Sequence, residues 1–270
     1  MIHQIKTVAE LRAWREPLWP AGKTLSFVPT MGALHEGHLE LVRQGQNCAD
    51  ICLPYIFLNP KQFSEGEDLG KYPKTLEQDL EKLEALGITH VYVPNAEEIY
   101  PDNFQTMVSV GDITKPLEGE HRPDFFNGVT TIVCKMLLQC IPEIAFFGEK
   151  DFQQLQVIKR MTRDLDIPVE IRGVETMRDE NGLALSSRNA YLSAKDYNIA
   201  IQLPKIMCDM ASGDMNENQA HQRFIDVGFD KVDYCTARNS ETFEPKNPNR
   251  ILVAVWLNGT RLIDNMAMTH

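Results

Sequence analysis

The chain has 270 residues, 43% of them hydrophobic, with a formal net charge of −11 and a pI of about 5.1. This length allows one large domain or two smaller ones, and the acidic balance opposes nonspecific binding to nucleic acid, which needs a basic face. A small anionic substrate is not excluded, because a few local Lys and Arg residues can form a cationic pocket.

The sequence gives no sign of export or of insertion into a membrane. Its first 20 residues, MIHQIKTVAELRAWREPLWP, carry charges throughout, which is unlike a signal peptide. No apolar run approaches the ~20 residues that a membrane span requires. The six cysteines form no Cys-x-x-Cys pair. We therefore expect reduced, mostly buried thiols in a soluble cytoplasmic protein.

Short apolar runs alternate with amphipathic stretches over the first two thirds of the chain. Leucines recur at helical spacing over residues 75–86, and Gly87 predicts the end of that helix. The apolar run at 51–58 contains Pro54, which predicts a bulged or irregular strand. The other expected elements are strands at 24–28, 89–94 and 143–148 and helices at 39–48, 128–139 and 151–164. This alternation predicts a parallel sheet with helices on both faces.

The pattern changes after about residue 175. A polar loop, RDENGLALSSRN, leads into the next elements. These are expected helices at 194–211 and 217–227, followed by strands at 232–237, 251–257 and 260–264. An order of helices and then strands predicts a second, smaller α+β domain.

Residues 27–38 read FVPTMGALHEGH and place two histidines just after an expected strand. In an open parallel sheet, ligands bind beyond the carboxyl ends of the strands. A helix that begins within this motif would point its free N–H groups into that crevice. Gly32 and Gly37 would let a base or a phosphate approach the backbone closely. His35 and His38 would stand on one face of the first turn, where imidazolium N–H groups would stabilise charge that develops on a phosphate.

Two other interpretations of the histidines stay open. A single His at the start of a helix is usually a surface or capping group. A pair can also bind metal, but HEGH has only two residues between its histidines, one fewer than the zinc-protease motif, and no third ligand is obvious nearby.

The segment FFGEKDFQQ at 146–154 has the same placement, at the end of an expected strand and the start of a helix. Gly148 permits close approach, and Lys150 offers a mobile cation suited to phosphate. Asp151 is a plausible N-cap. In isolation, Gly-Glu-Lys-Asp is also an ordinary turn composition.

Three further features carry polar groups. LSSRN places two hydroxyls and a guanidinium on a polar loop and fits a polyphosphate clamp, although a capped surface turn has the same composition. In FLNPKQF, Asn59 and Gln62 are neutral groups suited to hydroxyl or carboxylate recognition, while a plain loop is favoured for that segment alone. Asp79 lies off the leucine stripe of its helix, where most carboxylates are simply solvated.

In this order, PTMGALHEGH, FLNPKQF, FFGEKDFQQLQVIKRM, LSSRN and TRLIDN closely resemble the pantothenate synthetase (pantoate–β-alanine ligase) family, over nearly the whole chain. HEGH alone would indicate only the wider HIGH-motif nucleotidyltransferase superfamily. The resemblance implies a Rossmann-like α/β domain at residues 1–175, which holds the active site, and a smaller α+β lid domain at residues 176–270. It also implies a homodimer and a requirement for Mg²⁺.

The resemblance implies the reaction as well. ATP and (R)-pantoate give pantoyl adenylate and pyrophosphate, and β-alanine then displaces AMP to give pantothenate. The implied catalytic residues are His38, His35, Lys150, Ser186, Ser187 and Arg188. The implied nucleotide-binding residues are Met31, Gly32, Ala33, Leu34, His35, Glu36, Gly37, His38, Gly148, Glu149, Lys150, Asp151, Met177, Leu185, Ser186, Ser187 and Arg188. The substrate-binding residues are Gln62, Gln154 and Asn59, and Asp79 matches an acidic position near the metal.

Three departures from the family pattern stand out. Leu185 replaces the usual Met, which is a volume-conserving apolar change. Asp124 and Phe125 replace the usual Gly-His, so the resemblance does not fix the conformation of that loop. Lys74 stands where Arg is common, which keeps the charge but loses the bidentate fork.

Two other functions are weighed against this one. The first is a different HIGH-superfamily nucleotidyltransferase that acts on a phosphorylated alcohol, to which the neutral Gln62 and Gln154 are less suited. The second is a catalytically silent nucleotide-binding regulator, against which both histidines, Lys150 and the Ser-Ser-Arg loop count together.

Overall fold

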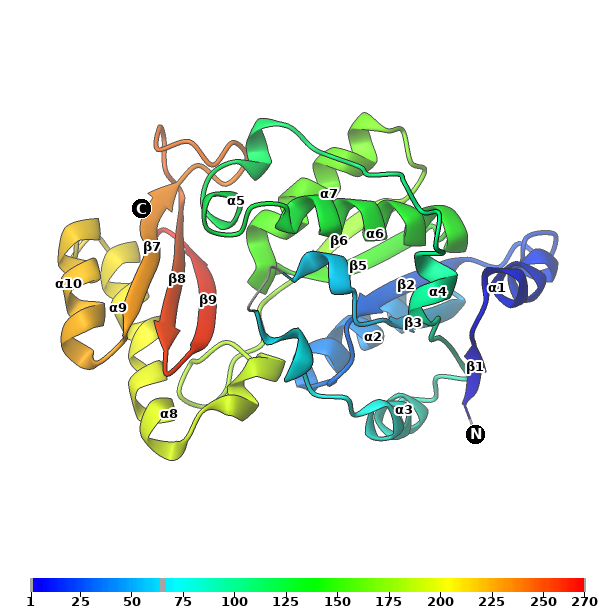
Figure 1. Cartoon of the computed structure of the whole chain (residues 1–270), viewed down its shortest axis with the longest axis horizontal. Coiled ribbons are helices and arrows are strands. Elements are labelled where there is room, and N and C mark those ends of the chain that lie inside the picture. Colours follow the sequence, from blue (N-terminus) through cyan, green and yellow to red (C-terminus); the bar gives the residue numbers. More distant parts are fainter. Residues whose placement is uncertain (1, 64–66, 270) are drawn as a thin grey trace.

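The structure, a computed structural model, describes residues 2–63 and 67–269. It contains two sheets, which stand side by side in Figure 1. The large sheet is parallel, in the order β1-β4-β3-β2-β5-β6. Its strands are β1 (His3–Ile5), β2 (Leu25–Thr30), β3 (Ile51–Ile56), β4 (His90–Tyr92), β5 (Ile144–Gly148) and β6 (Glu170–Val174). The predicted Rossmann-like α/β architecture is confirmed.

Helices cover both faces of this sheet, as the alternating pattern predicted. The helices in this part of the chain are α1 (Val8–Arg15), α2 (Glu36–Cys48), α3 (Leu76–Ala85), α4 (Ala96–Ile99), α5 (Glu118–His121), α6 (Phe125–Cys140) and α7 (Phe152–Asp164). Phe27 of β2 packs in an apolar cluster with α1, α6 and α7, whereas the next residue, Val28, packs in another with α2 and α3. Successive strand residues point to opposite faces, so each face has its own core.

The small sheet is antiparallel, in the order β7-β8-β9, and α9 and α10 lie on its side away from the large sheet (Figure 1). Its elements are α8 (Ala194–Ala200), α9 (Gln202–Ala211), α10 (Glu217–Val227), β7 (Lys231–Arg238), β8 (Arg250–Leu257) and β9 (Thr260–Ala267). The predicted smaller α+β body is therefore confirmed. We propose that the domain boundary lies just after β6, near residue 175, and call the two parts the N-terminal unit and the C-terminal unit.

Two local expectations were wrong. Residues 194–211 form two helices with Ile201 between them. The ring of Pro204 removes the N–H that would donate to Ala200 in one continuous helix. Pro54 causes no bulge, because β3 pairs with β2 in unbroken register from Ile51 to Ile56. The Ile51 and Phe57 N–H groups donate to the carbonyls of Thr24, just before β2, and Thr30, at its end. Alternation therefore turns the Pro54 nitrogen towards β4, which pairs with β3 only at Tyr55–Tyr92.

The strand order reverses beside β2. The chain runs from β2 to β3 and β4 on one side, and then crosses to β5 and β6 on the other. The carboxyl ends of β2 and β5 therefore flank the switch point, where ligands bind in open α/β sheets. The two motifs singled out by their position after strands, at 27–38 and 146–154, meet at this point.

The loop before α6 ends in a residue with a left-handed backbone conformation. Asp124 has a φ of 70°, a region that Asp tolerates better than most residues other than Gly. The helix then begins at Phe125, three residues earlier than expected. Asp124 thus supplies the left-handed turn at this position itself.

The cysteines are free, and four of the six are buried, as predicted. Within residues 2–63 and 67–269, no helix has both the length and the apolar character to cross a membrane.

Candidate active site

A cavity of about 840 Å³ lies at the switch point, lined by residues of both units. Most of the predicted site residues line it: Met31, His35, Gly37, His38, Asn59, Gln62, Gly148, Lys150, Asp151, Gln154, Met177, Leu185, Ser186, Ser187 and Arg188. The other predicted residues are not part of the lining: Gly32, Ala33, Leu34, Glu36, Asp79 and Glu149. Segments more than 100 residues apart in the sequence thus share one cavity, as the motifs predicted.

The turn that leads from β2 into α2 has an unusual backbone. Gly32 and Ala33 both have positive φ, 84° and 51°. The Asp79 carboxylate accepts hydrogen bonds from the N–H groups of Ala33 and Leu34, each at 2.8 Å. A left-handed Ala persists only where its surroundings fix it, and Asp79 supplies that support. Asp79 is 1% exposed, so the expectation of a solvated carboxylate was wrong.

The same geometry does not favour Asp79 as a metal ligand. Both of its oxygens already accept backbone N–H groups, and one also accepts the Thr75 hydroxyl at 3.2 Å. In the part of the chain that the structure describes, no three His, Cys, Asp or Glu side chains are placed to hold a metal ion. We therefore assign Asp79 to the support of the turn.

The two histidines cap α2. The Gly37 N–H donates to Nδ1 of His35 at 3.2 Å, and the His35 N–H donates to Nδ1 of His38 at 3.4 Å. Their rings lie 4.0 Å apart between centroids. Because each Nδ1 accepts a hydrogen bond, the neutral tautomer carries its proton on Nε2. The capping interpretation is thus correct, and it leaves each Nε2–H free to donate.

The imidazoles are neutral in this site. Burial, together with Lys150 and Lys82, lowers the pKa of His35 from 6.5 to about 4. Burial, His35 and Lys150 lower the pKa of His38 well below its ordinary value. The lowered pKa values do not favour imidazolium donors in the site without a ligand, and cationic side chains such as Lys150 and Arg188 line the same cavity.

The segment after β5 leaves its groups open to the cavity. A Cβ placed on Gly148 would meet no atom within 4 Å. Asp151 occupies the N-cap position of α7, as predicted, but its side chain makes no capping hydrogen bond. Its carboxylate is therefore available to a ligand.

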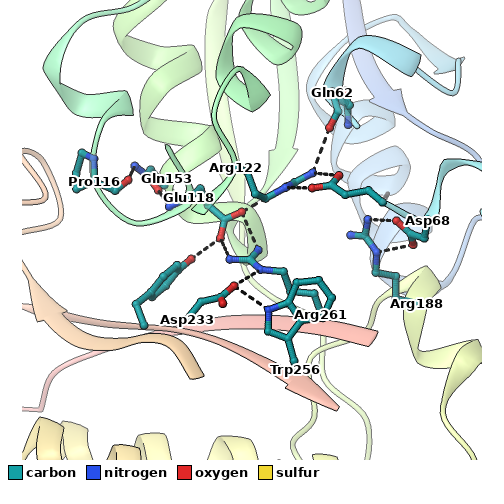
Figure 2. A network of polar contacts seen from close by, with 12 residues as sticks. Gln62, Asp68, Pro116, Glu118, Arg122, Gln153, Arg188, Asp233, Trp256 and Arg261 are labelled. Carbon is teal, nitrogen blue, oxygen red and sulfur yellow. Dashed lines mark hydrogen bonds and ion pairs between the residues drawn. The ribbon is translucent and has the colours of Figure 1, made fainter. Parts of the chain in front are cut away.

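The loop at 185–188 belongs to the C-terminal unit and contacts the N-terminal unit. Ser186 Oγ accepts the Arg188 N–H at 3.3 Å, so the capped-turn interpretation also holds. Ser187 Oγ donates to the Ala33 carbonyl at 3.0 Å. Arg188 forms a bidentate pair with Asp68, with both N···O distances at 2.8 Å (Figure 2). Burial alone would raise the pKa of Asp68, but the Arg188 guanidinium holds that pKa below its usual range.

A group of neutral amides occupies another part of the cavity. The Asn59 amide nitrogen donates to Gln62 Oε1 at 3.0 Å and to the Gly128 carbonyl at 3.3 Å. Its oxygen accepts from the Tyr100 hydroxyl and from the Lys61 N–H. These bonds use the capacity of the Asn59 amide, so Asn59 orients Gln62 and leaves direct recognition to it.

Sequence reasoning missed the apolar wall beside these amides. Val129, Ile132 and Val133 of α6 line the cavity together with Phe57. The sequence signal was only an apolar helix, and the pattern did not show which of its side chains face a ligand. Asp68, the partner of Arg188, was also missed because nothing in its local sequence distinguishes it.

Comparisons with known proteins agree over the full chain. The family described as pantoate-beta-alanine ligase matches residues 3–267. "Pantothenate synthetase" of Caulobacter vibrioides is 47% identical, over 98% of this chain and 98% of that protein. The crystal structure of pantothenate synthetase from Thermus thermophilus has a TM-score of 0.90 and 39% identity, with complete coverage of both chains. A Francisella tularensis pantoate-beta-alanine ligase "Complexed with Beta-gamma ATP and Beta-alanine" has a TM-score of 0.88 and 31% identity, over 99% of this chain and 98% of that one.

Proposed function

We propose that this chain activates (R)-pantoate with ATP before it joins pantoate to β-alanine. The chain belongs to the pantoate-beta-alanine ligase family and is an enzyme of that kind. The carboxylate of pantoate attacks the α-phosphorus of ATP, and pyrophosphate leaves. The amine of β-alanine then attacks the acyl carbon of pantoyl adenylate, loses a proton, and AMP leaves with the bonding electrons. The products are pantothenate, AMP and pyrophosphate.

One observation carries the proposal. The cavity at the switch point joins the α2 N-terminus, Lys150 and the 186–188 loop, each of which suits an anionic phosphate. The ATP named with the Francisella structure supports the same ligand. Such a site accelerates the reaction mainly by positioning and by charge stabilisation, because the transfer needs no covalent enzyme intermediate.

The histidines act in this scheme as neutral donors. Their Nε2–H groups donate to the phosphate oxygens as charge develops there, while Lys150 and Arg188 supply formal positive charge. Arg188 is shared with Asp68 in this structure, so a triphosphate would compete for its guanidinium. Met177 lies beside Gly37 and lines the same cavity, so we infer that it contacts the adenosine part of ATP.

The other part of the cavity fits an uncharged, hydroxyl-bearing acid. Gln62 and Gln154 offer neutral hydrogen bonds, and the α6 wall offers an apolar surface for a branched alkyl body. A phosphorylated alcohol would bring a second phosphate to a region of neutral amides. This arrangement favours pantoate over the substrate of the alternative nucleotidyltransferase.

A magnesium ion fits the carboxylate donors of the cavity. Mg²⁺ is usually held by one or two carboxylates together with substrate phosphates. Asp151 lines the cavity and leaves its carboxylate uncapped, so we infer that Asp151, rather than Asp79, would hold it. When bound, the ion would neutralise phosphate charge. A homodimer and a cytoplasmic location stay predictions.

The reactive adenylate requires protection from water. Pantoyl adenylate is a mixed anhydride, and a closed site would keep it intact until the amine arrives. The C-terminal unit contributes Leu185 to Arg188 and part of β9 to the cavity wall. It therefore suits the role of a lid that opens to admit substrates.

The decisive assay supplies ATP, Mg²⁺ and pantoate, with and without β-alanine, and follows pyrophosphate, AMP and pantothenate. The proposal expects one equivalent of bound adenylate without β-alanine, and continuous AMP release only with it. A nucleotidyl product that ignores β-alanine would identify the alternative nucleotidyltransferase. ATP binding without pyrophosphate release would identify a silent regulator.

A further inference from the structure

The motif RLIDN, residues 261–265 of β9, forms part of the cavity wall, but none of its residues has an individual role in the reaction steps above. Alternate residues of a strand share a face, so Arg261 and Asn265 lie on one side of β9, about 13 Å apart at ~3.3 Å per residue. Leu262, on the other side, packs into the core of the C-terminal unit. Within the C-terminal unit, Arg261 donates from Nε to Asp233 of β7 at 2.8 Å, and Asn265 accepts from Arg250 of β8. Both residues also reach the N-terminal unit.

Asn265 holds the turn that carries Lys150. Its amide nitrogen donates to the carbonyls of Glu149 at 2.8 Å and Lys150 at 3.0 Å. Its oxygen accepts from the Arg250 guanidinium, and the residue is only 4% exposed. With both amide hydrogens used on neighbouring carbonyls, Asn265 fixes the position of this turn relative to β9.

The preceding residue holds the loop of the C-terminal unit. Asp264 forms a bidentate pair with Arg178, at 2.6 and 3.0 Å, and its side chain is 1% exposed. Arg178 also donates to the Gly182 carbonyl at 3.0 Å, at the start of the segment that leads to Ser186. Two adjacent residues of β9 therefore fix both phosphate-facing segments.

Arg261, at the other end of the motif, contacts the buried carboxylate of Glu118 on α5. Its two terminal nitrogens donate to Glu118 at 2.9 and 2.7 Å, and the Tyr234 hydroxyl donates to the same carboxylate at 2.6 Å. Glu118 is 5% exposed. Burial alone would raise the pKa of Glu118, but Arg261 holds that pKa below its usual range. The carboxylate is therefore charged and depends on partners from the C-terminal unit.

Glu118 also contacts Arg122, which reaches Gln62 (Figure 2). Arg122 lies 3.4 Å from the Glu118 carboxylate, and it donates to the Gln62 carbonyl at 3.1 Å. It also pairs with Glu67 through two bonds of 2.7 Å. Arg122 thus contacts both Gln62 and Glu67, and Arg261 acts on Gln62 through Glu118 and Arg122.

We propose that the Arg261–Asn265 segment of β9 is a positioning element that sets both substrate loops of the N-terminal unit: Asn265 aligns Lys150 for ATP, and Arg261, through Glu118 and Arg122, aligns Gln62 for the acid. This proposal rests on the proposed function. Because one strand holds both loops, docking of the C-terminal unit onto the N-terminal unit would align the nucleotide and the acid together. The two ends should nevertheless fail differently when they are changed separately.

The test compares Asn265→Ala and Arg261→Lys in the ATP–pyrophosphate exchange reaction, which needs pantoate but no β-alanine. Misplacement by about 1 Å can cost 10²-fold in rate. Asn265→Ala should therefore lower the exchange kcat about 10- to 100-fold, with the KM for pantoate within about twofold of the wild type. Arg261→Lys keeps the charge but loses the fork, and it should raise the KM for pantoate about tenfold, with the KM for ATP almost unchanged.

Met266→Leu is the matched control, because Met266 is the next residue of β9 and packs against the core of the C-terminal unit. It should leave both parameters unchanged. If Asn265→Ala fails to fold, Asn265→Asp replaces it, because Asp has the same shape without the donors. If Arg261→Lys fails to fold, Tyr234→Phe replaces it, because it removes one bond to Glu118. Each substitute should change the kinetic parameters in the same direction as the variant that it replaces.

The outcomes separate the two proposals. Identical kinetic changes in the two variants, or wild-type kinetics in both, would overturn the positioning role while the enzyme still made pantothenate. The same loss in Met266→Leu would reduce the effect to general stability and overturn it as well. A wild-type enzyme without pantoate-dependent exchange would overturn the proposed function, and the positioning role with it.

Discussion

Asp79→Asn separates a structural role for this residue from a metal-binding one. The carboxylate accepts two buried N–H groups of the 33–34 turn at 2.8 Å each. Hydrogen bonds to charged groups contribute about 1.5–3 kcal/mol each. An Asn keeps one acceptor and turns an NH₂ group towards the other N–H, so one such bond is lost and a buried donor is left unpaired. The free energy of unfolding should fall by about 3 kcal/mol, or roughly 6–12 °C in Tm.

The assay is thermal and denaturant unfolding without ATP or Mg²⁺, followed by a Mg²⁺ titration of the reaction rate. Glu77→Gln is the matched control, because Glu77 is an exposed carboxylate on the same helix. The account predicts a stability loss in Asp79→Asn alone and an unchanged Mg²⁺ requirement at temperatures where the variant stays folded. Wild-type unfolding combined with a raised Mg²⁺ requirement would refute it and restore Asp79 as a metal ligand.

Three further predictions follow from the site. His38→Ala and Lys150→Ala should each slow pyrophosphate release in a single turnover at least a hundredfold, about the effect of one lost charge-stabilising donor, and near-normal rates would exclude these roles. Because the pKa of His35 is lowered to about 4, the unfolded chain binds more protons between about pH 4 and 6.5. Denaturant unfolding should therefore show stability falling as the pH is lowered through that window, and less steeply in His35→Asn; equal slopes would contradict the neutral imidazole. Gly128→Ala should be severely destabilised, because its Cβ would lie 2.1 Å from the Lys61 carbonyl oxygen. Gly148→Ala, whose Cβ would meet no atom within 4 Å, should unfold like the wild type and lose only ATP affinity. Similar unfolding of the two variants would refute the close approach at Gly128.

The positions of the main loops were predictable from the sequence for a simple reason. Alternating strands and helices imply a parallel sheet, and the carboxyl ends of parallel strands meet at one edge. The motifs at 27–38 and 146–154 each follow a strand, so their convergence followed from local pattern alone. The C-terminal helix at 217–227 was also predicted with the bounds that α10 has.

The supporting contacts were not predictable, because they join residues far apart in the chain. Asp79 is 45 residues from Leu34, and no periodicity of its own helix indicates that contact. Glu118 and Arg261 are 143 residues apart. The neutral state of the histidines depends on burial and on the nearby Lys150 and Lys82, which are tertiary properties. Only the folded chain brings these groups together.

The central claim is that the converged loops bring the α-phosphorus of ATP to the pantoate carboxylate. Pantoate labelled with ¹⁸O in both carboxylate oxygens tests it most directly, with mass spectrometry of the nucleotide and phosphate products. The account predicts that each AMP formed together with pantothenate carries one ¹⁸O from the acid. Unlabelled AMP, or ¹⁸O found in pyrophosphate or inorganic phosphate, would contradict it.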